Sequence, residues 1–160
     1  MSTPDYPDRI HFFSYGTKIS LELPVGWEER EQQGNNAIYV LEADDDDVDL
    51  AFDPILVVAT VRLPTSDDDA HLRLAAALLD AHRTARVLAH NDIAIDAMPA
   101  IEDITLGRDP DVTAEAVRYQ AVAQLDNVGF TFTGVAPADM ADEFIDIFRS
   151  AVASARMIPV

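Results

Sequence analysis

The residues of this sequence best suited to chemistry form an acidic run over residues 42–49. Hard cations such as Ca²⁺ prefer several carboxylate oxygens, so this run is the first metal candidate. A calcium loop beginning at Asp45 would place Leu50 where glycine is needed and Leu56 where a bidentate glutamate is needed. The sequence therefore predicts no specific metal site, only a solvated acidic loop. Weak cation binding, if there is any, would fall on Asp44, Asp45, Asp46 and Asp47.

The four histidines are the next candidates, at positions 11, 71, 82 and 90. None has a close partner at metal-ligand spacing. His71 and His82 share a predicted helix face but lie about three turns apart, roughly 16 Å at 1.5 Å per residue. That distance is too long for one metal ion. We expect each histidine to be a surface or half-buried residue.

Motifs of known enzyme classes are missing from the sequence. There is no cysteine, so disulfides and thiolate chemistry are excluded. No serine lies in a Gly-x-Ser-x-Gly elbow, and no glycine-rich phosphate loop occurs. Carboxylate pairs are so frequent that they carry no information, because acid–base catalysis needs a buried pair with separated pKa values. We predict no catalytic residue and no cofactor, and expect that the chain is not an enzyme.

The charge of the chain excludes further classes. Twenty-nine acidic residues against eleven basic ones give a formal net charge of −18, and Lys18 is the only lysine. Nucleic-acid binding and anionic membrane surfaces both require clustered cations and are disfavoured. The charge indicates either solubility or a surface that attracts a basic partner. No apolar signal region and no membrane-length run occur, which predicts a cytoplasmic, bacterial-type protein; removal of an export signal is the open alternative.

The last forty residues carry the clearest structural signal. Residues 117–125 and 128–133 alternate with period two around Asp126-Asn127, which predicts a two-residue hairpin. In that register Ala123 faces Phe130 and Ala121 faces Phe132. A helix should follow from Pro137 to about residue 155 and end before Pro159. Its apolar stripe consists of Met140, Phe144, Ile147, Phe148, Ala151, Val152 and Ala155.

The rest of the chain reads as further strands and one more helix. Strands are predicted over residues 10–15, 17–23, 37–41, 55–61, 87–95 and 100–106, and a helix over 67–83 with Ser66 as its N-cap. Residues 37–41 and 55–61 are apolar at both odd and even positions, which predicts strands buried on both faces. Trp27, delivered by the turn at 24–26, is either a core residue or a ligand-stacking residue.

These patterns predict an α+β fold, a mostly antiparallel sheet of about six to seven strands with helices on both faces in three layers. Residues 1–9, with two prolines, should form a loose tail, and residues 10–158 a single domain.

Four segments, in this order, resemble the PsbP-like superfamily, which includes DcrB-like and LpqN-type proteins. They are Leu23-Pro24-Val25-Gly26-Trp27, the helix near 67–83, the turn at Met98-Pro99-Ala100, and the final segment from Thr133 to the helix holding Phe148 and Arg149. The resemblance covers residues 10–155 and implies an antiparallel sheet between helices, in proteins that bind rather than catalyse. The chain departs from the lipoproteins of this superfamily in having no lipobox cysteine, and the acidic segment has no counterpart. No catalytic residue carries over.

Three hypotheses follow. The first is a non-catalytic module that binds an unknown protein partner through a sheet edge or an open apolar groove and forms a homodimer. The second is a small-molecule binder or enzyme with a pocket near Trp27 and Tyr39. The third is a protein that recognises a basic partner through its charge.

Overall fold

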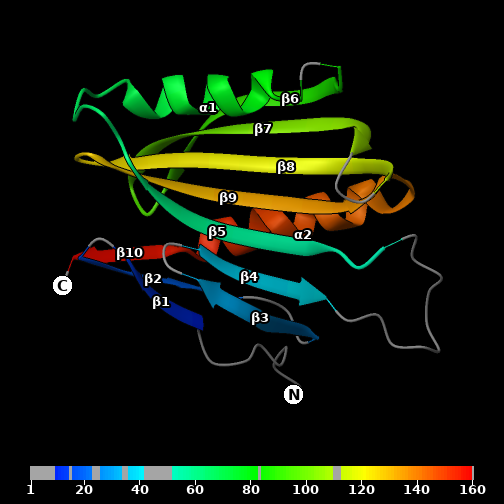
Figure 1. Cartoon of the computed structure of the whole chain (residues 1–160), viewed down its shortest axis with the longest axis horizontal. Coiled ribbons are helices and arrows are strands. Elements are labelled where there is room, and N and C mark those ends of the chain that lie inside the picture. The colour runs from blue at the N-terminus through cyan, green and yellow to red at the C-terminus, as the bar shows by residue number, and fades with distance from the viewer. Residues whose placement is uncertain are drawn as a thin grey trace.

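The computed structural model describes residues 10–14, 16–22, 26–33, 36–41, 52–82, 84–109 and 113–159. The tail at 1–9 and the acidic segment at 44–47 lie outside these residues. The described part forms ten strands, one short 3₁₀ helix and two α-helices (Figure 1). The elements are β1 (Ile10–Ser14), β2 (Thr17–Leu21), β3 (Trp27–Gln33), β4 (Asn36–Leu41), β5 (Ile55–Arg62), α1 (Ala70–Asp80), β6 (Arg86–Ile95), β7 (Met98–Asp109), β8 (Ala114–Leu125), β9 (Val128–Pro137), η1 (Ala138–Met140), α2 (Ala141–Ser154) and β10 (Arg156–Pro159).

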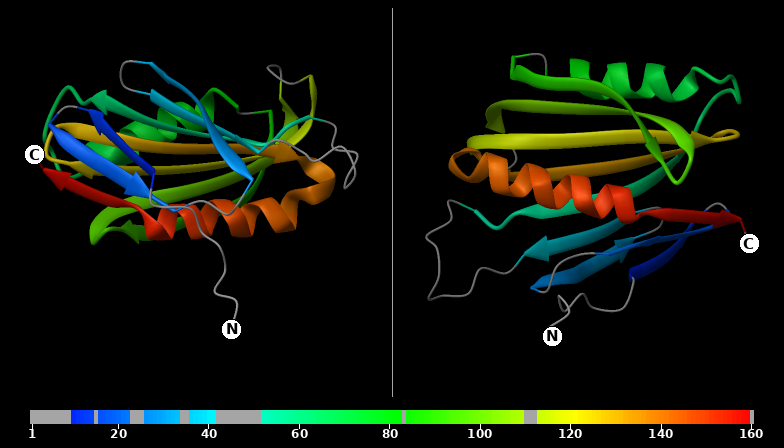
Figure 2. Two further views of the ribbon diagram at one scale, coloured as in Figure 1. Left: turned by 90° about the horizontal axis from the view of Figure 1, so that it is seen from below. Right: turned by 180° about the vertical axis from the view of Figure 1, so that it is seen from behind.

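Seven strands form the main sheet, in the order β3-β4-β5-β9-β8-β7-β6. Each neighbouring pair is antiparallel. Helix α1 packs on β7 and β8, and α2 packs on β8 and β9. Figure 2 shows the two helices on opposite sides of the sheet. The predicted α+β class and its three layers are confirmed.

A second sheet was not predicted. Strands β1 and β10 both pair with β2, so the last strand of the chain lies beside the first hairpin (Figure 1). The C-terminal segment pairs through Met157 opposite Ile19. The sequence suggested only that the helix stops before Pro159, and four residues are too few to show a strand period. The helix ends at Ser154.

The β8–β9 hairpin has the predicted register. Leu125 pairs with Val128, Ala123 with Phe130, and Ala121 with Phe132. Asp126 has a φ of 54°, the left-handed conformation that a tight turn requires. Further along, Gly134 lies under the ring of Phe148, and a Cβ there would come within 2.6 Å of the ring. Glycine at this position lets the helix approach the sheet closely.

Two helix starts differ from the prediction. Pro137 ends β9 instead of opening the helix, and α2 begins at Ala141 after the 3₁₀ turn. Helix α1 begins at Ala70, with Asp69 in the N-cap position and no side-chain cap. The Thr65 hydroxyl accepts a hydrogen bond from the Asp67 backbone N–H at 3.1 Å, which holds the preceding residues in a turn instead.

The α2 face of the sheet holds the main core. Phe144 and Phe148 are buried as predicted, and Phe148 lies 6.1 Å from the ring centroids of both Trp27 and Tyr119. The large side chains that are fully buried come mainly from this face. They are Tyr119, Phe130, Phe132, Phe148, Ile19, Leu21, Leu56, Ile95 and Ile104.

The α1 face has a smaller apolar cluster. It consists of Ala75, Ile101 and Val122, with Leu74 and Leu78 packed against them. Strand β5 is buried only on the α2 side, through Leu56, Val58 and Thr60, while the residues between them are half-buried. The prediction that β5 is dry on both faces is therefore wrong. The physical reason is the position of α1, which packs mainly on β7 and β8 and approaches β5 only at its end, where Leu74 and Val61 both lie beside Gly129.

Candidate functional site: the half-covered face of the sheet

A row of polar residues crosses the α1 face of the sheet. His90, Asp103, Gln120 and Thr133 are directly opposite one another on β6, β7, β8 and β9. His90 Nδ1 hydrogen bonds to the buried carboxylate of Asp103, and Gln120 Nε2 donates to the Thr133 hydroxyl at 2.8 Å. The hydrogen bond and charge of Asp103 raise the pKa of His90 above its ordinary value. These two hydrogen-bonded pairs occupy the middle of the α1 face, in place of a large apolar core.

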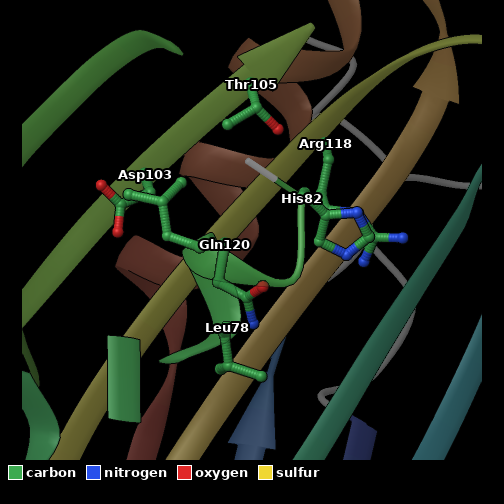
Figure 3. Close-up of a pocket in the computed structure, with 7 residues that line it drawn as sticks. Leu78, His82, Asp103, Thr105, Arg118 and Gln120 are labelled. Atoms are coloured by element: carbon green, nitrogen blue, oxygen red, sulfur yellow. The ribbon is translucent and has the colours of Figure 1, made fainter. Parts of the chain in front are cut away.

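Helix α1 covers part of this row, and a small pocket remains beneath its C-terminal end (Figure 3). The cavity measures about 10 Å³, which is room for one water molecule at most. It is lined by Leu78, Leu79, His82, Asp103, Thr105, Arg118 and Gln120. Beside it, Arg118 Nη2 donates to Asp109 at 2.7 Å, and both side chains are largely buried. A space this small does not accept a metabolite.

Beyond α1, the same face is mainly apolar and partly exposed. Ile55, Val57 and Ala59 on β5 are half-buried, and Val61 is 38% exposed. Thr131 and Thr133 of β9 are also half-buried and lie opposite Ala59 and Val57. No helix passes in front of β5 or β9 in Figure 1. We call these six residues the open strip. It is an apolar band edged by hydroxyl groups.

On the opposite face, the largest polar cluster fastens α2 to the sheet. The Glu102 carboxylate, 5% exposed, accepts hydrogen bonds from Arg149 Nη2 at 2.9 Å and Asn91 Nδ2 at 3.1 Å. Burial favours the protonated acid, but these donors outweigh it and lower the pKa of Glu102. Burial first, and then the charge of Glu102, raise the pKa of the Tyr119 hydroxyl. Among the described residues, no group lies in a hydrogen-bonding position to that hydroxyl.

A wider cleft lies where α1 begins. It has a volume of about 380 Å³ and is lined by Ser66, Asp68, His71, Pro99, Gln124 and Asp126. Gln124 Oε1 accepts from the His71 backbone N–H at 2.9 Å, and the His71 ring nitrogen Nδ1 lies 3.2 Å from the same oxygen. Gln124 Nε2 donates to the carbonyls of Asp67 and Asp126. These bonds tie α1 to the hairpin turn and bury His71, which was expected at the surface or half-buried.

The predicted site residues are placed as follows. Trp27 is buried and its ring meets Phe148 edge-on, the position of a core residue. The backbone of Tyr39 pairs with Leu56, but its side chain lies outside the described part. The pocket near these two residues stays a prediction. Asp44, Asp45, Asp46 and Asp47 also lie outside. Among the described residues, no group of three metal-ligating side chains comes together.

Sequence reasoning did not find the open strip or the polar row. The alternation that marks a half-exposed strand is hidden in β5, because its residues are apolar on both parities. His90 and Asp103 are thirteen positions apart, and only the register of β6 with β7 brings them together. The two-residue turn at Asp96–Ala97 sets that register, and both residues have positive φ. Alanine rarely adopts this conformation, so the sequence gives no clear signal for the turn.

Comparison with known proteins identifies the fold. Neither a protein-family model nor a curated protein sequence matches the chain. Solved structures do match. The cell-envelope biogenesis protein LpqN of Mycobacterium tuberculosis superposes with a TM-score of 0.71 at 13% identity, over 94% of this chain and 90% of that one. The chain has the PsbP/Mog1-like fold.

Two further solved structures share this fold. The Ran-binding protein Mog1p of Saccharomyces cerevisiae gives a TM-score of 0.64 at 14% identity, covering 93% of this chain and 95% of that one. The PsbP protein of the cyanobacterium Synechocystis gives 0.57 at 13%, covering 92% and 91%. The resemblance inferred from the sequence is therefore confirmed at the level of the fold.

The structure also bears on the prediction that the chain does not cross a membrane. Among the described residues, neither α-helix combines the length and the apolar character that crossing a bilayer requires.

Proposed function

We propose that this chain is a non-catalytic module that binds a protein partner on the open strip of β5 and β9. The observation that carries the proposal is the partial exposure of apolar side chains on the central strand β5. Val57 and Ala59 lie between buried neighbours, and Val61 is 38% exposed. A contiguous apolar patch rimmed by polar residues is typical of a protein-interaction site.

The chemistry of the strip defines the partner. Apolar side chains on β5 would receive an apolar ridge, and the hydroxyls of Thr131 and Thr133 on β9 would face its polar flank. An amphipathic helix has this arrangement. The net charge of −18 favours a basic helix, since opposite charge speeds encounter. Mog1p, which shares the fold, is a Ran-binding protein, so the fold supports protein recognition elsewhere.

Affinity capture from the native host tests the proposal. Wild type is compared with a Val57→Asp/Val61→Asp double variant and with Ile158→Asp, which changes an exposed apolar residue of β10. We expect a reproducible partner to be lost with the double variant and kept with the control. Recovery should also fall as salt rises, because the partner is basic. Equal recovery by all three proteins would contradict the proposal.

The small-molecule alternative has less support. The structure gives a pocket of about 10 Å³ under α1, and the larger cleft at the start of α1 has an open, polar lining. Typical ligand sites enclose several hundred Å³ with mostly apolar walls. Trp27 packs on Phe148 and leaves little of its ring for stacking.

A further inference from the structure

The outer edge of the main sheet is a second exposed surface, independent of the open strip. β6 is ten residues long and, within the described part, pairs only with β7. Val87 and Leu88 are 50% and 43% exposed. After an irregularity between Val87 and Ala89, the pairing with β7 is regular through Ile95. A regular edge strand presents a row of backbone donors and acceptors to any strand that can pair with it.

The side chains of this edge divide between the two faces of the sheet. His90 is opposite Asp103, so His90 and Asp92 belong to the α1 face. Asn91 is opposite Glu102, so Ala89, Asn91 and Ile93 belong to the α2 face. A basic group and an acidic group therefore stand two residues apart on one face of a free edge. Such an arrangement is complementary to itself when the strand is turned end for end.

We propose that β6 pairs antiparallel with β6 of a second copy of this chain, with Asn91 at the two-fold axis. In this register each His90 faces Asp92 of the other copy, and the contact occurs twice. On the other face Ala89 meets Ile93, a small residue against a large one. The seven-stranded sheets of the two copies would join into one continuous sheet.

Neighbouring registers are less favourable. An axis at His90 sets two histidines against each other, and an axis at Asp92 sets two carboxylates against each other. Like charges directly opposite destabilise a strand pair. An axis at Ala89 would carry the pairing into the irregular segment before it, and an axis at Ile93 would use Asp96, which is in the turn and accepts a hydrogen bond from Met157 N.

The helices leave room for this pairing. α1 lies over β7 and β8, so the α1 helices of the two copies would be about four strand spacings apart, roughly 19 Å. Helices in contact are about 8–10 Å apart, so these would not collide. The open strip lies on β5 and β9, separated from β6 by β8 and β7, and stays accessible. Repulsion between two copies of net charge −18 is screened within about 8 Å at physiological salt.

Cysteine substitution tests the register, because the chain has no cysteine of its own. Ala89→Cys, Asn91→Cys and Ile93→Cys are prepared separately and oxidised mildly. Directly opposite residues have Cα atoms about 5 Å apart, within disulfide reach. In the proposed register the two copies of Ala89 are roughly 13 Å apart, and so are those of Ile93. We expect a covalent dimer for Asn91→Cys in several-fold higher yield than for the other two.

Sedimentation velocity gives an independent readout. Wild type should be a dimer, and Asp92→Lys, which sets a lysine opposite His90, should dissociate at least about tenfold more readily. Asp80→Lys makes the same charge change on the exposed side of α1 and should stay dimeric. Circular dichroism confirms folding of each variant. A wild type that sediments as a monomer at every concentration, or cross-linking without preference for position 91, would overturn the proposal.

Discussion

The two faces of the main sheet are built from the same strands and have opposite character. Under α2, aromatic rings fill the space, and the charged cluster around Glu102 is hydrogen bonded. Under α1, a hydrogen-bonded polar row takes the place of a second large core, and the sheet beyond it is half-exposed. One face therefore supplies most of the apolar burial that stabilises the fold, and the other face can stay partly exposed without loss of the core.

The largest difference between the two faces is expected at two adjacent residues of β5. Val58→Asp places a carboxylate without a partner in the α2-face core and should cost more than about 4 kcal/mol. Val57→Asp places the same group on the half-open face, where water reaches it, and should cost about 1 kcal/mol. Urea unfolding of both variants measures the difference. Equal losses would show that the α1 face is closed.

The second prediction concerns the aromatic contact between α2 and the sheet. Phe148→Ala removes a fully buried ring that packs on Trp27, Tyr119 and Gly134, and should cost about 3–5 kcal/mol. Val61→Ala on the open strip should cost less than about 1 kcal/mol. Chemical denaturation compares the two. A loss below about 1 kcal/mol for Phe148→Ala would mean that α2 does not hold the sheet.

The third prediction tests the charged contact of α2. Arg149→Met leaves the Glu102 carboxylate buried without its cation and should cost about 1–3 kcal/mol, with the lower end favoured because Arg149 is 44% exposed. The double variant Arg149→Met/Glu102→Gln should recover part of the loss.

The same cluster predicts a pH dependence. The pKa of Glu102 is lowered in the folded state, so the stability that its carboxylate contributes is present above its unfolded pKa and is lost as pH falls through the folded pKa. Thermal melts over an acidic pH series measure this loss. A difference in melting temperature between wild type and Glu102→Gln that does not change with pH would contradict the prediction.

The smallest effect is expected at the exposed end of the polar row. The pKa of His90 is raised in the folded state, first by its hydrogen bond to Asp103. The protonated form therefore adds stability below the unfolded histidine pKa, and the gain is lost as pH rises through the raised folded pKa. His90→Gln should abolish this dependence. NMR titration of the His90 ring measures the pKa directly, and a value at or below about 6.5 would contradict the assignment.

Local patterns carried the predictions that the structure confirms. The hairpin at residues 125–128 and the apolar stripe containing Phe144 and Phe148 both follow from periods of two and 3.6, which depend only on neighbouring residues. The fold was predicted from the order of several weak motifs that resemble a known superfamily.

Features that depend on distant contacts could not be predicted in this way. The pairing of β10 with β2 joins the last strand to the second, and Arg149 meets Glu102 from 47 positions away. The open strip depends on where α1 lies, because β5 is apolar on both sides and its sequence does not say which side is covered.

The most direct test of the account is site-specific photo-cross-linking in cells of the native host. A photoreactive phenylalanine derivative is placed at Val61 on the open strip and, as the matched control, at Ile158, an exposed apolar residue of β10. The account predicts a discrete cross-linked partner from position 61 and none from position 158. The same products from both positions, or none from position 61, would contradict the claim that the half-covered face is the binding surface.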